Sequence, residues 1–169
     1  DSGRVLAFEP DPENCDQLRK NIKANGFKCI ELHQCALSDD EGSATFHAAG
    51  GLGSLVDNPT VSAFNFEQRE ITVRTRLLDN VLEEEHVRHV DLIKMDVEGA
   101  DLMVLRGAEK TLSTMTTSLL MDVDIWSNVE RAALFDLLHS CGFKIYRVGK
   151  QLEPISGADR LFFFDENGR

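Results

Sequence analysis

Short apolar runs alternate with amphipathic stretches along most of the chain, and this alternation predicts strands that alternate with helices. The first pair is an apolar strand over residues 4–8, which ends before Glu9, and a helix over residues 12–25. Residues typical of helix ends flank it, namely Asp11 and Pro12 at the start and Gly26 at the end. Between them, an apolar stripe at three- and four-residue spacing consists of Cys15, Leu18 and Ile22. Such a stripe is suited to cover one face of a sheet.

The same alternation continues to the end of the chain. We expect further strands over residues 28–37, 43–49, 71–78, 91–96, 118–126, 143–149 and 159–165. Helices are expected over residues 78–87, 100–112 and 131–142, the last after a capping box at Ser127 and Glu130. The inward positions of the last two helices are predicted to be Leu102, Leu105, Ala108, Leu112, Leu134, Leu137 and Leu138. This order indicates a single α/β domain with a mostly parallel, doubly wound sheet.

Polar residues, most of them acidic, follow four of the predicted strands. They are Glu9, the pair Ser38 and Asp39, the pair Asp96 and Glu98, and the pair Asp122 and Asp124. Parallel strands of an open sheet bind ligands at their carboxyl ends. A carboxylate at a buried edge costs free energy unless it is hydrogen-bonded or liganded, so the pattern predicts a binding site at this rim.

The chemistry of these residues fits a nucleoside. Glu9, at the end of the first predicted strand, is placed to accept hydrogen bonds from both hydroxyls of a ribose. Backbone groups of Ala36 and Leu37 could hold an adenine, with Ser38 or Asp39 accepting from its exocyclic amine.

Charge and composition narrow the class of partner. The net charge is −11 and the basic residues are scattered, which argues against binding to nucleic acid. No apolar run approaches the roughly 20 residues of a membrane span. The four cysteines have neither zinc-site nor disulfide spacing, so we expect reduced, buried thiols in a cytoplasmic protein. His86 and His89 form an H-x-x-H pattern, which we interpret as a solvated helix face rather than a metal site.

Five segments carry a family resemblance. In order and spacing, "GRVLAFEPDPENCDQLRKNI", "ALSDDEGSATF", "LLDNVL", "DLIKMDVEGADLMVLRGA" and "LFDLLHSCGFKIYRV" resemble the FkbM family of S-adenosylmethionine-dependent methyltransferases. The resemblance implies the class I methyltransferase fold. It also implies S-adenosylmethionine as cofactor, with Glu9 and Pro10 at its ribose, the segment Ala36, Leu37, Ser38 and Asp39 at its adenine, and Asp96 beside its methionine part. The implied reaction is methyl transfer to a hydroxyl of a small-molecule or carbohydrate acceptor, such as a sugar, a glycan or a natural product.

Two features differ from the family pattern. The family's opening strand and glycine-rich turn do not occur within the sequence, so we expect them to precede Asp1 and the domain over residues 1–169 to be incomplete at its N-terminus. Where the family usually has a Glu and a His, the chain has Asp122 and Asp124. The candidates for the catalytic base, which would remove the hydroxyl proton, are therefore Asp96, Glu98 and Asp124. The segment from Gly50 to Gln68 is expected to be a mobile loop near the acceptor.

Three other interpretations remain open. Asp96, Asp122 and Asp124, with Asn128, could bind Mg²⁺ and orient a vicinal diol for methylation. An NAD-binding module would also use Glu9 on a ribose, but it requires a glycine-rich turn before that residue. A non-catalytic scaffold of the same fold is the third, and cofactor binding distinguishes it from an enzyme.

Overall fold

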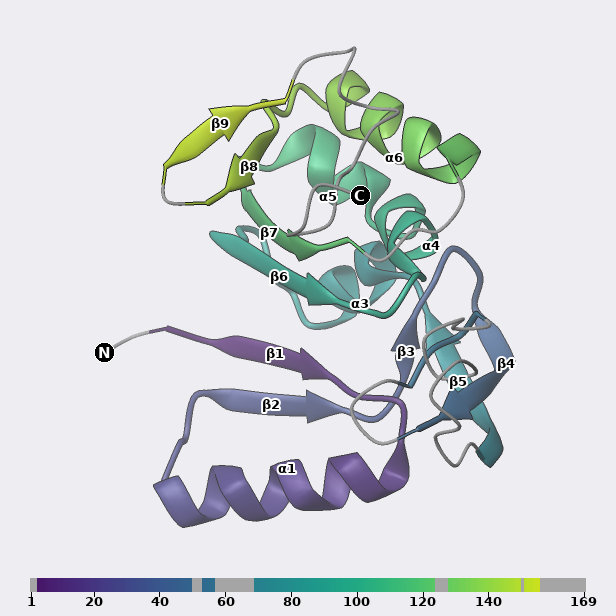
Figure 1. The fold of residues 1–169 in the computed structure, drawn as a ribbon. Helices are drawn as coiled ribbons and strands as arrows, with labels where there is room; N and C mark the ends of the chain where they lie inside the picture. Colours follow the sequence, from purple (N-terminus) through teal and green to yellow (C-terminus); the bar gives the residue numbers. More distant parts are fainter. Residues whose placement is uncertain (1–2, 50–52, 57–68, 124–127, 150, 156–169) are drawn as a thin grey trace.

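The computed structural model describes residues 3–49, 53–56, 69–123, 128–149 and 151–155 (Figure 1). The expected strand over residues 159–165 lies outside these ranges, as do Ser127 of the predicted capping box and most of the segment from Gly50 to Gln68. The described part is a mixed α/β structure with both parallel and antiparallel strand pairs.

The first unit is strand β1 (Val5–Phe8), helix α1 (Pro12–Asn25) and strand β2 (Ile30–His33). β1 and β2 are parallel, with Phe8 opposite His33. The predicted helix ends are confirmed: the side chain of Asp11 accepts from the backbone N–H of Glu13, and Gly26 adopts the left-handed conformation, with φ 68°. Cys15 is completely buried on the inward face of α1.

A separate three-stranded sheet contains β3 (Ala36–Leu37), β5 (Arg69–Arg76) and β4 (Gly42–Ala48), in that order. β3 is parallel to β5, and β4 is antiparallel to it. The prediction of one strand over residues 28–37 was therefore wrong. The chain turns after His33, whose carbonyl accepts from Cys35 N, and the two halves of that run pair in different sheets.

The segment with the strongest family resemblance begins at β6 (Leu92–Asp96), after helix α3 (Leu78–Glu84). Instead of the single helix predicted over residues 100–112, it forms α4 (Asp101–Arg106) and α5 (Glu109–Thr114), separated by a turn at Gly107. The predicted inward positions of this segment are nevertheless all buried, namely Leu102, Leu105, Ala108 and Leu112.

The remaining elements are β7 (Ser118–Asp122), α6 (Asn128–Ser140), β8 (Tyr146–Val148) and β9 (Leu152–Pro154). β7 is parallel to β6. β8 pairs with β9 as an antiparallel hairpin, whereas the strand after residues 143–149 was expected only at residues 159–165. On α6, Leu134 and Leu138 are buried as predicted and Leu137 is half-buried, while Phe135, only 2% exposed, is a core residue that the prediction omitted.

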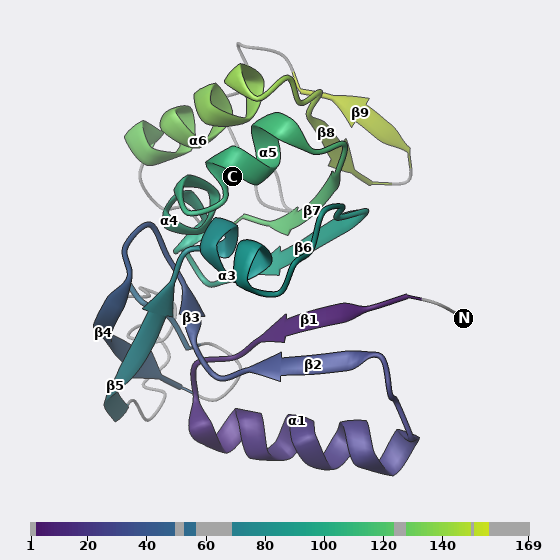
Figure 2. The same cartoon turned by 180° about the vertical axis from the view of Figure 1, so that it is seen from behind.

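The two parallel pairs face each other without joining. Figures 1 and 2 show β1 beside β6, with α1 on the outer side of β2 and the helices α3 to α6 around β6 and β7. Within the described ranges, no strand pairing connects β1 with β6, so the expected continuous sheet is instead a set of smaller sheets. We call the part with β1, α1 and β2 and the part with β6, β7 and their helices the two halves of the molecule. They are in contact through a hydrophobic core, in which Leu6 and Phe8 of β1 pack against the cluster around Leu102 and Leu105.

Candidate functional site

The carboxyl ends of the parallel strands lie on one side of the molecule. In Figure 1 the arrowheads of β1, β2, β6 and β7 all point toward the β3–β5–β4 sheet, and Figure 2 shows the same arrangement from behind. This side therefore holds the described polar residues at the ends of β1, β6 and β7, namely Glu9, Asp96, Glu98 and Asp122, and it lies next to the sheet that contains Ala36 and Leu37. We call this side the rim.

Glu9 follows β1 and is half-buried at the rim. Its Oε1 accepts from the backbone N–H of Asp11 at 2.8 Å, and its backbone N–H donates to His33 O at 3.1 Å. Burial raises the pKa of the carboxyl, an effect that hydrogen bonds from Asp11 and Asn14 partly offset. Pro10, the next residue, is also half-buried. A carboxylate has about four acceptor positions, so Glu9 has capacity for further donors.

The segment from Ala36 to Asp39 is held on both sides. On one side Ala36 and Leu37 pair with β5, and the backbone N–H of Ser38 donates to Arg76 O at 2.9 Å. On the other side lies the turn between α4 and α5. A Cβ added to Gly107 would come within 2.0 Å of the Ser38 carbonyl oxygen, so only glycine fits there.

The residue before that glycine also reaches this segment. Nη1 of Arg106 lies 3.6 Å from Oδ2 of Asp39. The predicted helix over residues 100–112 is interrupted here because Asp79 takes its backbone groups: Asp79 N donates to Gly107 O at 3.0 Å, and the Asp79 carboxylate accepts from Thr111 N at 2.8 Å. The contacts of Arg106 and Gly107 link the end of the "DVEGADLMVLRGA" segment to the residues expected at the adenine.

The beginning of the same segment carries the acids of β6. Asp96 ends β6, where its Oδ2 lies 2.7 Å from Nζ of Lys94, and it is the register partner of Asp122 in β7. Two residues later the backbone makes an unusual turn: Glu98 has φ 49° and Gly99 has φ 95°. A non-glycine residue in this region is uncommon and costs free energy, which is typical of functional sites.

Sequence reasoning missed Ser54. Its hydroxyl donates to the carbonyl oxygen of Glu98 at 2.6 Å, and the residue is only 1% exposed. The glycine-rich stretch around it was expected to be a mobile loop, but Ser54 contacts the rim through Glu98 and pairs with His47 of β4. The sequence offers only a weak indication that Ser54 is buried, namely a small polar residue between apolar neighbours.

Several predicted site residues are not brought together by the described structure. Asp124 lies outside the described ranges, as does the side chain of Asn128, so the proposed magnesium set reduces to Asp96 and Asp122, which are both exposed. His86, with φ 55°, and His89, which pairs with Asp91 at 3.0 Å, both lie beyond the end of α3 at Glu84, so the interpretation of the two histidines as a helix face was wrong. The four cysteines are free, and Cys29 is exposed, contrary to the expectation of buried thiols.

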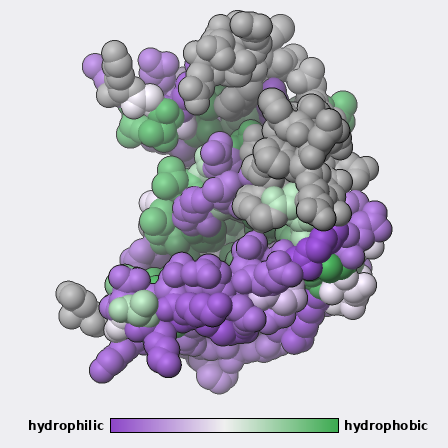
Figure 3. Space-filling view, turned by 60° about the horizontal axis from the view of Figure 1, so that its bottom comes forward, coloured by the Kyte–Doolittle hydropathy of each residue, from purple (hydrophilic) through white to green (hydrophobic). Residues whose placement is uncertain are grey.

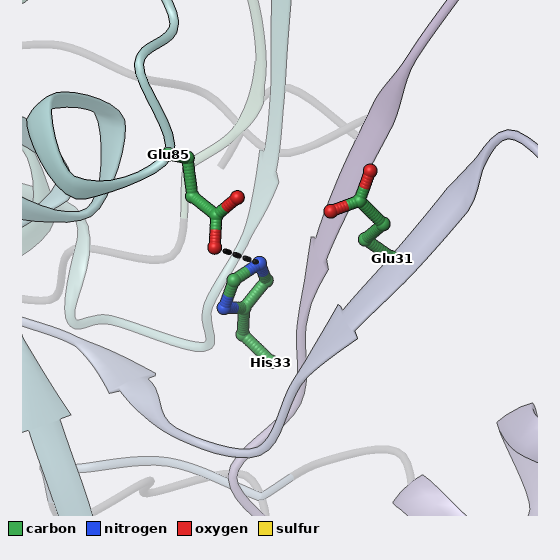
Figure 4. A group of neighbouring side chains, drawn as sticks. All are labelled: Glu31, His33 and Glu85. Atoms are coloured by element: carbon green, nitrogen blue, oxygen red, sulfur yellow. Dashed lines mark ion pairs between the residues drawn. The ribbon is translucent and has the colours of Figure 1, made fainter.

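Another group of possible metal ligands lies between the two halves. Glu31, His33 and Glu85 each offer a ligand atom within 4.8 Å of the others (Figure 4). Both carboxylates already bind a cation: the Arg4 guanidinium donates to Glu31 at 2.6 Å from Nε and from Nη2, and also to Glu85. His33 stacks on Phe8 and its Nε2 lies 4.0 Å from Glu85. We therefore interpret the group as an ion-pair network centred on Arg4.

The surface is hollowed. Figure 3 shows a recess with hydrophobic residues on its inner wall, above a half of the molecule that is largely hydrophilic.

Among the described residues, no helix combines the length and the apolar content that a membrane span requires.

Comparison with known proteins decides the family. The model of the "Methyltransferase FkbM domain" matches residues 1–145 of this chain. The chain belongs to the FkbM methyltransferase family. The match covers β1 through α6 and therefore every described residue of the rim, which confirms the resemblance inferred from the five sequence segments.

Two proteins similar to this chain have names that describe a reaction. The chain is 30% identical over 122 residues to the 2-O-methyltransferase NoeI of Sinorhizobium fredii, a match that covers 65% of this chain and 49% of that protein. It is 29% identical over 111 residues to the hexuronic acid methyltransferase AglP of Haloferax volcanii, with 66% and 44% covered. The chain thus spans about half the length of these relatives.

A solved structure supports the fold. The crystal structure of the FkbM methyltransferase from Methylobacillus flagellatus superimposes with a TM-score of 0.53 at 19% identity, covering 82% of this chain and 30% of the other. At that identity the likeness concerns the fold alone.

Proposed function

We propose that the protein is an S-adenosylmethionine-dependent O-methyltransferase that acts on a hydroxyl of a sugar, a glycan or a natural product. The observation that carries this proposal is the rim, where Glu9, the segment from Ala36 to Asp39, and the Asp96–Glu98 turn follow parallel strands on one side of a protein of the FkbM family. Membership of the family supports methyl transfer, and the rim chemistry supports a nucleoside-containing donor.

The residues present fit the donor. Glu9, with Pro10 beside it, would receive the ribose hydroxyls, because its half-buried carboxylate has acceptor positions beyond those used by Asp11 and Asn14. Ala36 and Leu37 would contact the adenine, with Ser38 or Asp39 accepting from its amine. Bound S-adenosylmethionine supplies an activated methyl group. Asp96 would lie on the methionine side, where its negative charge favours a cationic ligand.

The chain's own contribution to the reaction is orientation and proton acceptance. Methyl transfer requires the acceptor oxygen to be aligned with the methyl group, and positioning supplies much of the rate. We propose that Glu98, in its constrained turn, is the main candidate for the group that accepts the hydroxyl proton, while Asp96 and Asp124 are the other candidates.

The proposed class of acceptor is supported by the reactions that the names of two relatives describe. One relative is named for methylation of a 2-hydroxyl oxygen and another for methylation of a hexuronic acid. We therefore propose a carbohydrate hydroxyl as the first class of acceptor to test.

We also propose that the domain is of the class I methyltransferase type, with one further parallel strand between β1 and β6. The support is that these two strands run side by side in the same direction and that neither has a strand partner on the facing edge within the described ranges. Unsatisfied backbone groups in the middle of a sheet are costly, so a strand there would stabilise both halves.

Calorimetric titration with S-adenosylhomocysteine tests the donor site. The full-length protein that carries this sequence is expected to bind, and Glu9→Ala is expected to weaken binding by about 10- to 100-fold, because hydrogen bonds to a charged group are lost. Asp16→Ala, at an exposed carboxylate on α1, is the matched control and is expected to bind like the wild type. Absence of binding by the wild type, or equal binding by Glu9→Ala, would refute the assignment.

A further inference from the structure

The stretch from Gly53 to Val56 is fixed to the β3–β5–β4 sheet. The backbone of Ser54 pairs with His47 in both directions, at 2.9 and 3.2 Å. Gly53 lies directly on the ring of Phe46, since an added Cβ would be 2.7 Å from two of its carbon atoms. Leu55 packs against the small core around Phe46 and Val73. Ser54 therefore has a fixed backbone from which its side chain can act.

The Ser54 hydroxyl connects this stretch to the rim. It donates to the carbonyl oxygen of Glu98, 44 positions away in the sequence, at 2.6 Å, and it accepts from the backbone N–H of Val56 at 3.1 Å. With both roles used and the residue 1% exposed, the hydroxyl is held in one orientation in a place from which water is largely excluded. The bond is therefore a defined contact between two distant segments.

The partner of this bond is the most constrained backbone of the rim. Glu98 has φ 49° and Gly99 has φ 95°, and the turn is closed by Ala100 N donating to Val97 O at 3.2 Å. A non-glycine residue persists in this conformation only where its surroundings hold it. Ser54 is a side chain from outside the segment that fixes the carbonyl of the constrained residue.

We infer that Ser54 is a positioning residue for the Glu98 turn: its hydroxyl fixes the backbone that carries the Glu98 carboxylate. This inference rests on the proposed function for the role of Glu98, but the positioning itself rests on the geometry alone. Of the residues proposed for the donor, Glu9 and the segment from Ala36 to Asp39 follow other strands, and Asp96 is held within β6 by its pairing with β7 rather than by the turn. Loss of the Ser54 hydroxyl should therefore affect methyl transfer more than donor binding.

Two measurements on Ser54→Ala test the inference. Backbone amide exchange at Glu98 to Ala100 is expected to become at least about tenfold faster, since one buried hydrogen bond to the turn is lost. With glucuronic acid as the acceptor probe, kcat is expected to fall about tenfold, while the Kd for S-adenosylhomocysteine stays within about twofold of the wild type. Ser54→Thr, which keeps the hydroxyl, is expected to restore both.

A double mutant separates positioning from general stability. If Ser54 acts through the Glu98 side chain, Ser54→Ala is expected to cause little further loss of kcat in a Glu98→Gln background. Ser140→Ala removes a similar hydroxyl-to-carbonyl bond on α6, at 2.7 Å, and is expected to leave the exchange at Glu98 to Ala100 unchanged.

The outcomes are distinguishable. Unchanged exchange at Glu98 to Ala100 in Ser54→Ala overturns the inference, whatever the enzyme activity. An equally large loss of kcat with and without the Glu98 carboxylate overturns the part that assigns the action to that side chain. If the wild type does not bind S-adenosylhomocysteine, the proposed function fails, while the exchange experiment still decides the positioning.

Discussion

Glu9 combines two properties that oppose each other. It is half-buried, which raises the pKa of its carboxyl, yet its proposed role requires an acceptor with a negative charge. The hydrogen bonds from Asp11 and Asn14 compensate only part of the cost of burial. A residue that is unfavourable for stability where it stands is a reasonable candidate for a functional residue.

A pH series on Glu9→Gln tests this opposition. Because the folded-state pKa of Glu9 is raised above its unfolded value, the native state binds more protons between those two values, and stability falls as pH rises through that window. Glutamine can still accept from Asp11 N and does not ionise. The variant is therefore expected to match the wild type near pH 4 and to be more stable at pH 7 in thermal unfolding.

The control for this series is Glu13→Gln, since Glu13 is exposed and lies in the first turn of α1. A stability difference between wild type and Glu9→Gln that does not change with pH would contradict the interpretation.

The N-terminus of α1 depends on Asp11, which is buried and has two partners. Its Oδ1 accepts from Glu13 N at 2.8 Å, and Oδ2 lies 3.2 Å from Nη2 of Arg69 at the start of β5. Asp11→Ala is expected to lower the free energy of unfolding by about 1–2 kcal/mol, because the helix cap is lost. Asp11→Asn keeps an oxygen for the cap and is expected to cost less than half as much. Urea unfolding measures both, and equal costs would assign the effect to the ion pair instead.

The turn between α4 and α5 depends on Gly107. Gly107→Ala would force a Cβ against the Ser38 carbonyl, so the free energy of unfolding is expected to fall by roughly 1–3 kcal/mol, as for an overpacked core. S-adenosylhomocysteine should also bind more weakly, because Ser38 would move. Gly3→Ala is the control, since an added Cβ there contacts nothing within 4 Å. If urea unfolding and calorimetry give wild-type values for Gly107→Ala, the close approach is not required.

Elements with local signals could be predicted from the sequence, and elements shaped by distant contacts could not. The ends of α1 follow from Asp11 and Gly26, which act on adjacent backbone groups. The break between α4 and α5 follows from Asp79, whose carboxylate accepts from the backbone N–H of Thr111, 32 positions away in the sequence. The rim residues after β1 and β6 could be proposed because strand ends are visible in the hydrophobic pattern. Ser54 could not, because its partner is 44 positions away.

At the scale of the molecule, Arg4 connects the two halves. From the residue preceding β1 its guanidinium binds Glu31 of β2 and Glu85 after α3, which raises the pKa of the arginine and lowers that of Glu31. Arg4→Met is expected to lower the melting temperature in dilute buffer and to have a smaller effect in 1 M salt, because the ion pairs are exposed and therefore screened. Thermal unfolding at two salt concentrations measures this. An equal effect at both would mean that Arg4 acts through packing.

The pairing of β4 with β5 has a consequence for how the family can diversify. Ala48 and Arg69 are register partners, so the two ends of the connection between these strands are held side by side by the sheet itself. Lengthening a connection whose ends are already adjacent costs little, since the closure entropy grows only with the logarithm of its length. Insertions and deletions there would leave both strands intact. The length of this connection can thus change during evolution while β4 and β5 keep their pairing.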